Sequence, residues 1–182
     1  MDPLQLSTRT IDSGNITEPV NRITNELTEL ADGLAMVESF SHTYALLTDD
    51  GLCCFDASGS GSGLQVVDAL RTWSTAPFST LVYTHGHADH IGGSFAFAKD
   101  AAANGAPPLA VIAHENVNRR IDRYNDTNGW NIAINQRQFG GVTSEMGLEL
   151  GDELTRFLPR STLRPSETFA TTYDKTFGDT WP

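Results

Sequence analysis

The chain of 182 residues is long enough to bury the core of one domain, and its 39% hydrophobic and 19% charged residues are typical of globular proteins. Acidic residues outnumber basic ones by 23 to 12, so the average field would repel a phosphate backbone, and nucleic acid is not an expected partner. The sequence shows neither a secretory signal nor an apolar stretch long enough to cross a bilayer, so we expect no membrane association and a cytoplasmic location.

The distribution of polar and apolar residues predicts three segments. Residues 1–32 mix polar residues with prolines and are predicted to form an N-terminal arm, with one short helix between Asn21 and Ala31. Residues 33–159 carry regular apolar patterns and are predicted to form the folded domain. Residues 160–182 are rich in Ser and Thr, so we expect a tail of low order.

The domain opens with three short apolar runs separated by turn residues, a pattern that predicts an antiparallel meander. The runs are residues 34–37, 44–47 and 52–55. The third run contains the adjacent residues Cys53 and Cys54. Neighbouring cysteines in a strand seldom pair without strain, so we expect two buried free thiols.

Helices and strands alternate after the meander. Residues 58–63 are only Gly and Ser and lack the Lys-Ser/Thr of a phosphate-binding loop, so we interpret them as a flexible strand-to-helix connection. Apolar residues at helical spacing and short apolar runs between breakers locate the later elements. The predicted helices start near Leu64, Phe95 and Val117, and the predicted strands cover residues 81–84 and 109–113. This alternation predicts an α/β fold with a mixed sheet and flanking helices.

Four residues that can bind metal ions lie in one short stretch at the end of a predicted strand. They are His85, His87, Asp89 and His90. Imidazoles and a carboxylate suit zinc, and the spacing lets the first two residues hold one ion while the last two hold a second. The alternative is a polar surface loop. Metal binding is favoured because three of the five histidines of the chain fall within six residues.

The stretch from Thr84 to His90, Thr-His-Gly-His-Ala-Asp-His, resembles the signature of the metallo-β-lactamase superfamily. This resemblance implies an αββα sandwich with one or two zinc ions at the sheet edge, of which residues 33–159 would form the N-terminal part. Within the superfamily, residues 21–141 are more similar to the alkyl-sulfatase-like branch. The residues that carry this second resemblance are 38–42, 84–93, 114–117, 119–120, 123–124, 131 and 134–139.

The resemblance implies a zinc-dependent hydrolase of alkyl sulfate esters, in which the metals lower the pKa of a bound water. Asp89 would hold a metal and help to position the attacking hydroxide. Asp56, at the end of the third apolar run, would accept a hydrogen bond from a ligand imidazole. A thioesterase, lactonase or β-lactamase is the alternative, because the motif fixes the metal and leaves the substrate open. The expected partner is a small-molecule ester substrate.

Residues beyond the cluster are candidates for supporting roles. His114 ends a predicted strand, and we interpret it as supporting a ligand or capping the next helix, with direct ligation as the alternative. A basic stretch that also contains Arg120 supplies the predicted substrate-binding residues Arg119, Arg123, Asn131 and Arg137. Arginine forks suit a sulfate or carboxylate, although a solvated helix face with ordinary ion pairs explains these arginines equally well.

Members of this superfamily complete the metal site with downstream ligands that include a last histidine, and no histidine follows His114 in this chain. By resemblance, the second half of the sandwich is missing. We therefore expect a partner C-terminal half or a truncated, catalytically incomplete product. Strand faces left uncovered would promote self-association, and the chain by itself is expected to be a poor catalyst.

Overall fold

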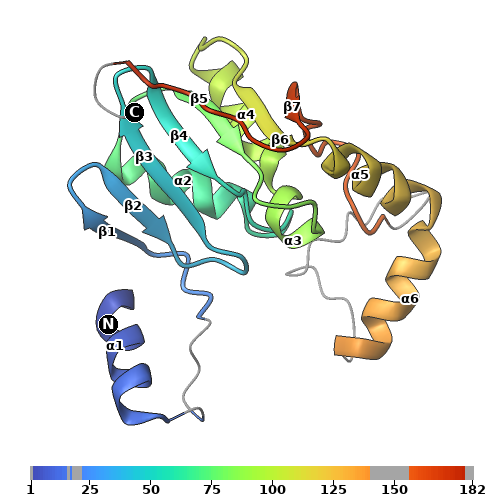
Figure 1. Cartoon of the computed structure of the whole chain (residues 1–182), viewed down its shortest axis with the longest axis horizontal. Coiled ribbons are helices and arrows are strands. Elements are labelled where there is room, and N and C mark those ends of the chain that lie inside the picture. Colours follow the sequence, from blue (N-terminus) through green and yellow to red (C-terminus); the bar gives the residue numbers. More distant parts are fainter. Residues whose placement is uncertain (1, 16, 18–21, 140–155, 179–182) are drawn as a thin grey trace.

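The computed structural model describes residues 2–15, 17, 22–139 and 156–178 (Figure 1). A mixed sheet of seven strands forms its centre, and the strands lie side by side in chain order. They are β1 (Leu27–Ala31), β2 (Leu34–Val37), β3 (Thr43–Thr48), β4 (Gly51–Phe55), β5 (Phe78–Val82), β6 (Ala110–His114) and β7 (Glu167–Phe169). The pairs from β1 to β4 are antiparallel, whereas those from β4 to β7 are parallel. The predicted α/β class and the predicted meander are confirmed.

Helices connect the parallel strands. They are α2 (Gly63–Trp73), α3 (Ala88–Ile91), α4 (Ser94–Ala103), α5 (Asn116–Asp126) and α6 (Asn128–Phe139). α2 and α4 pack together behind one face of the sheet (Figure 1), where the ring centroids of Phe97 and Phe78 are 4.9 Å apart. Leu52, Cys54 and Leu81 are completely buried in the same cluster. The main core therefore lies between this face and the two helices.

Other segments cover the second face of the sheet. Side chains alternate along a strand, so Cys53 points away from Cys54, and both thiols are buried and free as predicted. Thr80 and Ile112 are also at most 3% exposed. The last described residues cross in front of β4 and β5 (Figure 1), and Lys175 interacts electrostatically with Cys53. The C-terminal segment thus shields this face.

The N-terminal residues contain a helix, α1 (Pro3–Ser13), that we did not predict. Asp2 caps it, because its side chain accepts a hydrogen bond from the backbone N–H of Leu4 at 2.7 Å. The proline at the first position satisfies the helix geometry without needing a backbone donor. Gly14 ends the helix with a φ of 63°, a conformation that glycine adopts without strain.

The helix predicted between Asn21 and Ala31 is wrong, because β1 occupies residues 27–31 and pairs with β2. Leu27, Leu30 and Ala31 have the spacing of a helical face, but backbone pairing with the meander favours the strand. β1 and β7 extend the sheet beyond the predicted domain limits of residues 33 and 159. None of the described helices is both long and apolar enough to span a bilayer.

The Gly/Ser-rich connection between β4 and α2 is packed, not flexible as predicted. Ser58 is completely buried. A Cβ atom added to Gly93 would lie 2.1 Å from the carbonyl oxygen of Ala57, and one added to Gly63 would lie 2.6 Å from the Cα of Gly93. Backbone therefore packs directly against backbone, and the glycines are required by this close approach. Asp56 lies two residues before this packed stretch.

Candidate metal centre

The predicted metal ligands and the predicted orienting residue Asp56 lie at the carboxyl ends of two parallel strands. Asp56 directly follows β4, and β5 leads through Thr84 into the loop that begins with His85. β4 and β5 are paired neighbours, so their ends meet at one edge of the sheet, where α/β folds commonly place their sites. The short helix α3 follows and carries Asp89 and His90.

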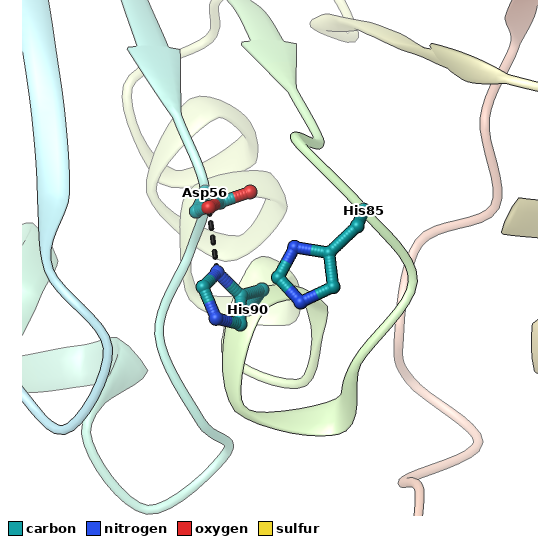
Figure 2. Close-up of side chains that lie close together, drawn as sticks. All are labelled: Asp56, His85 and His90. Atoms are coloured by element: carbon teal, nitrogen blue, oxygen red, sulfur yellow. Dashed lines mark hydrogen bonds and ion pairs between the residues drawn. The ribbon is translucent and has the colours of Figure 1, made fainter.

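A buried carboxylate, that of Asp56, orients His90. One oxygen of Asp56 accepts a hydrogen bond from the backbone N–H of Thr84 at 2.8 Å. The other oxygen accepts from the Thr84 hydroxyl at 2.6 Å and from Nδ1 of His90 at 2.6 Å (Figure 2). Asp56 adopts a φ of 60°, which aspartate tolerates better than most residues. The Nδ1 proton is thereby fixed, and Nε2 of His90 keeps its lone pair.

The Thr84 hydroxyl extends this network to His85. Its single proton goes to Asp56, so its oxygen accepts the hydrogen bond that joins it to Nδ1 of His85 at 3.0 Å. His85 therefore carries its proton on Nδ1 as well, which leaves Nε2 free to act as a metal ligand. One carboxylate sets the tautomer of both histidines, directly for His90 and through a hydroxyl for His85.

The imidazole rings converge beside this network. The ring centroid of His85 lies 4.0 Å from the ring centroid of His90 and 4.5 Å from that of His87. Donor atoms of Asp56, His85 and His90 lie within 4.8 Å of one another. Three hydrogen bonds already occupy the carboxylate of Asp56, so we assign it the orienting role rather than that of a ligand. The donor nitrogens of His87 are outside this group.

Asp89 and Ser41 lie on the other side of His90. Nε2 of His90 is 3.5 Å from an Asp89 carboxylate oxygen and 2.8 Å from the Ser41 hydroxyl. The same hydroxyl is 3.5 Å from the Asp89 carboxylate, so the polar groups of Ser41, Asp89 and His90 lie close together. Imidazole nitrogens and a carboxylate oxygen together fit a borderline divalent ion such as zinc. The individual ligand roles of His85, His87, Asp89 and His90 stay predictions.

Burial and charge shift the pKa values of two of these histidines in opposite directions. Burial lowers the pKa of His85, and the neighbouring imidazoles of His90 and His87 lower it further. Burial also disfavours protonation of His90, but the hydrogen bond and charge of Asp56 and the charge of Asp89 raise the pKa of His90 above its usual value. His85 is consequently neutral at pH 7, the form that binds metal ions.

A cavity of about 430 Å³ opens beside Asp89 and His87. Its floor and walls come from the helices after β6 and from the loop before β3. Its lining includes Arg120, Arg123, Tyr124, Trp130, Asn131 and Ile134. Trp130 and Ile134 are 63% and 40% exposed, so the cavity presents apolar surface together with cationic groups. Such a lining suits an amphipathic small molecule.

The four predicted substrate-binding residues are placed differently. Arg123 and Asn131 line this cavity, whereas Arg119 and Arg137 are not among its lining residues. Arg119 is 77% exposed and lies 3.8 Å from Glu115 one turn earlier, the ordinary ion pair that was the alternative interpretation. The amide nitrogen of Asn131 donates to the carbonyl oxygen of Thr127 at 2.8 Å.

His114 caps a helix. Its Nδ1 accepts a hydrogen bond from the backbone N–H of Asn116 at 3.1 Å, at the start of α5. Its Nε2 donates to the carbonyl oxygen of Ala170 at 2.9 Å. Both ring nitrogens are therefore occupied, which favours the capping role over ligation.

Three residues near the cluster were not selected from the sequence. Thr84 lies inside the recognised motif but was given no role. Arg120 belongs to the basic stretch interpreted as a possible anion-binding wall, but it was not among the selected substrate-binding residues. Ser41 is separated from His90 by 49 positions, and the sequence carries no local signal that would join them.

A family model for the metallo-beta-lactamase superfamily matches residues 36–149, which include all of the residues described above between Glu38 and Trp130. No match was found among curated proteins. Two solved structures are similar in fold. A double mutant of the sec-alkyl sulfatase PisA1, an enzyme from Pseudomonas sp., is 23% identical with a TM-score of 0.52, and the match covers 63% of this chain and 19% of that one.

The subclass B3 metallo-beta-lactamase BJP-1 of Bradyrhizobium japonicum is 20% identical with a TM-score of 0.52, and the match covers 85% of this chain and 48% of that one. The chain thus spans less than half the length of either structure. At these identities, the two likenesses support the fold alone. Because the family model matches more than half of the sequence, the chain belongs to the metallo-beta-lactamase superfamily.

Proposed function

We propose that this chain is the metal-binding part of a zinc-dependent hydrolase that cleaves sulfate esters of apolar alcohols. The observation that carries the proposal is the hydrogen-bonded unit of Asp56, Thr84, His85 and His90, which occupies Nδ1 of both histidines and leaves Nε2 of each as the candidate ligand atom. Nε2 of His90 contacts the Ser41 hydroxyl, which a bound ion would displace. When bound there, zinc ions would supply Lewis acidity that activates water and polarises the ester.

The chain's own residues support the remaining steps. Asp56 holds the His90 ring directly and the His85 ring through Thr84. Both imidazoles are therefore already oriented before a metal ion binds, and binding costs little further side-chain entropy. Asp89 adds a negative charge beside His90. The adjoining cavity offers Trp130 and Ile134 to an alkyl chain, and Arg123 at its wall attracts an anionic group.

Two measurements test this proposal. Zinc content of the purified chain is compared with that of the double variant His85→Ala/His87→Ala, and we expect the variant to lose most of its metal. Turnover is then followed with decyl sulfate, a decanoyl thioester and a lactam, using the protein that carries this chain. Equal zinc content in both forms would contradict the metal site. Cleavage of the thioester or the lactam, without release of sulfate from decyl sulfate, would contradict the proposed preference for sulfate esters.

A further inference from the structure

The arginines of α5 differ in whether a carboxylate neutralises them. Arg119 pairs with Glu115 at 3.8 Å and is 77% exposed. Arg120 is half-buried, and no carboxylate in the described part of the chain lies within ion-pairing distance of it. Its Nε atom is buried and has no hydrogen-bond partner among the described residues. An unsatisfied buried donor on a cation is costly, so the described part of the chain leaves the charge of Arg120 uncompensated. An external anion could reach it only through the terminal nitrogens of the guanidinium, because Nε is closed to the cavity.

The position of Arg120 is fixed by contacts on both sides. Its guanidinium lies over the ring of Tyr124, with 4.9 Å between Cζ and the ring centroid. On the other side, a Cβ atom added to Gly86 would lie 3.0 Å from Cβ and 3.1 Å from Cγ of Arg120. The glycine between His85 and His87 therefore lets the ligand loop rest directly on the stem of this arginine.

Arg120 consequently lines two cavities that flank His87. One, of about 380 Å³, also contacts His85 and His114. The other, of about 430 Å³, is the amphipathic cavity described above, which also contains Arg123 and Asp89. Arg120 is the half-buried cation next to the metal-binding loop, whereas Arg123 is exposed.

We infer that Arg120 binds the anionic group of the substrate and sets the preference of the site for sulfate-type esters over neutral ones. A planar guanidinium held by Tyr124 presents two parallel N–H donors, which match two oxygens of a tetrahedral anion. The alkyl part of the ligand would then extend toward Trp130. This inference rests on the proposed function, because it assumes that the cavity beside Asp89 receives the substrate.

The test measures binding of decane-1-sulfonate, whose C–S bond is not an ester bond, by calorimetry and by the change in tryptophan fluorescence that disappears in a Trp130→Phe background. Decan-1-ol serves as the neutral counterpart. Arg120→Met keeps the aliphatic stem and the packing but removes the charge, and the matched control is Arg119→Met, one position away. We expect Arg120→Met to weaken sulfonate binding by about tenfold or more, with Arg119→Met within about twofold of the original chain.

Arg120→Lys keeps the charge without the fork and should fall between the two, while all forms should bind decan-1-ol equally. Equal losses in the Arg119 and Arg120 variants would mean a general field effect and would overturn the inference. If Arg120→Met does not melt cooperatively, the test rests on Arg120→Lys. An unchanged sulfonate affinity in that variant would show that the paired donors of the guanidinium do not bind the anion.

The readout requires no turnover, so the two proposals can fail separately. Sulfonate binding that depends on Arg120, without hydrolysis of decyl sulfate, would refute the proposed function alone. Hydrolysis of decyl sulfate with unchanged KM in Arg120→Met would refute the role of Arg120 alone.

Discussion

The hydroxyl of Thr84 decides which nitrogen of His85 is available to a metal ion. A neutral imidazole has two tautomers of similar energy, and only a hydrogen bond to one nitrogen selects between them. Asp56 reaches His90 directly but reaches His85 only through Thr84. Threonine at this position therefore belongs to the site although it is not one of the predicted metal ligands.

Replacing Thr84 with valine keeps the branched shape and removes the hydroxyl. We expect the affinity of the purified chain for zinc to fall by about 10- to 100-fold, the usual effect of losing a group that orients a ligand. Thr84→Ser restores the hydroxyl and should retain most of the affinity. Competition with a chromophoric zinc chelator measures both, with thermal melting as the control for folding. An unchanged affinity in Thr84→Val would show that the relay does not orient His85.

At the scale of elements, local patterns were sufficient where the apolar period agreed with the final packing. Val117, Ile121 and Tyr124 share one face at helical spacing, and all three are buried in α5. The same spacing could have distinguished the two adjacent arginines, because Arg120 lies three residues after Val117 and four before Tyr124. Arg119 lies off this face, so helical geometry alone predicts that it points to solvent.

Elements and contacts that depend on distant partners could not be predicted in this way. β1 is a strand because it pairs with β2, not because of its own apolar period. The histidine loop was evident from its residues, whereas the contact of Ser41 with His90 requires β3, β4 and β5 to be in register first. The capped helix α1 was missed although Asp2, Pro3 and Gly14 are recognisable start and stop signals.

Packing of the histidine loop on α5 can be tested at Gly86. Gly86→Ala places a methyl group against the backbone and stem of α5, including the Cα of Val117 at 3.5 Å, so the loop and the helix must separate slightly. We expect a loss of about 1–2 kcal/mol in the free energy of unfolding, together with weaker zinc binding. The matched control is Gly129→Ala in α6, where an added Cβ meets nothing within 4 Å.

Because alanine favours a helix over glycine, this control should stabilise the chain by up to about 1 kcal/mol and leave zinc binding unchanged. Chemical denaturation and zinc competition measure both quantities. If the two alanine variants behave alike, close packing at Gly86 does not position the loop.

At the scale of the whole molecule, the two faces of the sheet are protected by different parts of the chain. We expected strand faces left uncovered, but Cys53, Thr80 and Ile112 on the second face are buried beneath or beside the C-terminal segment. Gly178 donates its N–H to the Asp50 carboxylate at 3.1 Å, which attaches this segment to the turn between β3 and β4. Self-association stays a prediction, and uncovered strand faces at these positions are not its cause.

The two adjacent cysteines report on these faces separately. Burial raises the pKa of Cys53 to about 11, against an ordinary value of 9.0, despite the opposing charge of Lys175. Burial also raises the pKa of Cys54 strongly, and that residue belongs to the core beneath α2. A raised thiol pKa stabilises the folded chain below pH 9 and loses this contribution as the pH rises toward about 11. Near pH 8, both thiols should therefore be almost unreactive while the chain is folded.

Removing the C-terminal cover should expose one cysteine and not the other. Phe177 is 9% exposed and lies next to Lys175, so Phe177→Ala should loosen the segment over the second face without emptying the core under α2. We expect Cys53, in the single-cysteine variant Cys54→Ala, to react with a thiol reagent at pH 8 at least about tenfold faster, because local opening rather than global unfolding then exposes it. Cys54, in the variant Cys53→Ala, should change much less.

The converse substitution, Leu70→Ala in α2, leaves a cavity in the main core and should accelerate the reaction of Cys54 instead. If Phe177→Ala accelerates both cysteines equally, the chain opens only by global unfolding, and the C-terminal segment is not a separate cover of the sheet.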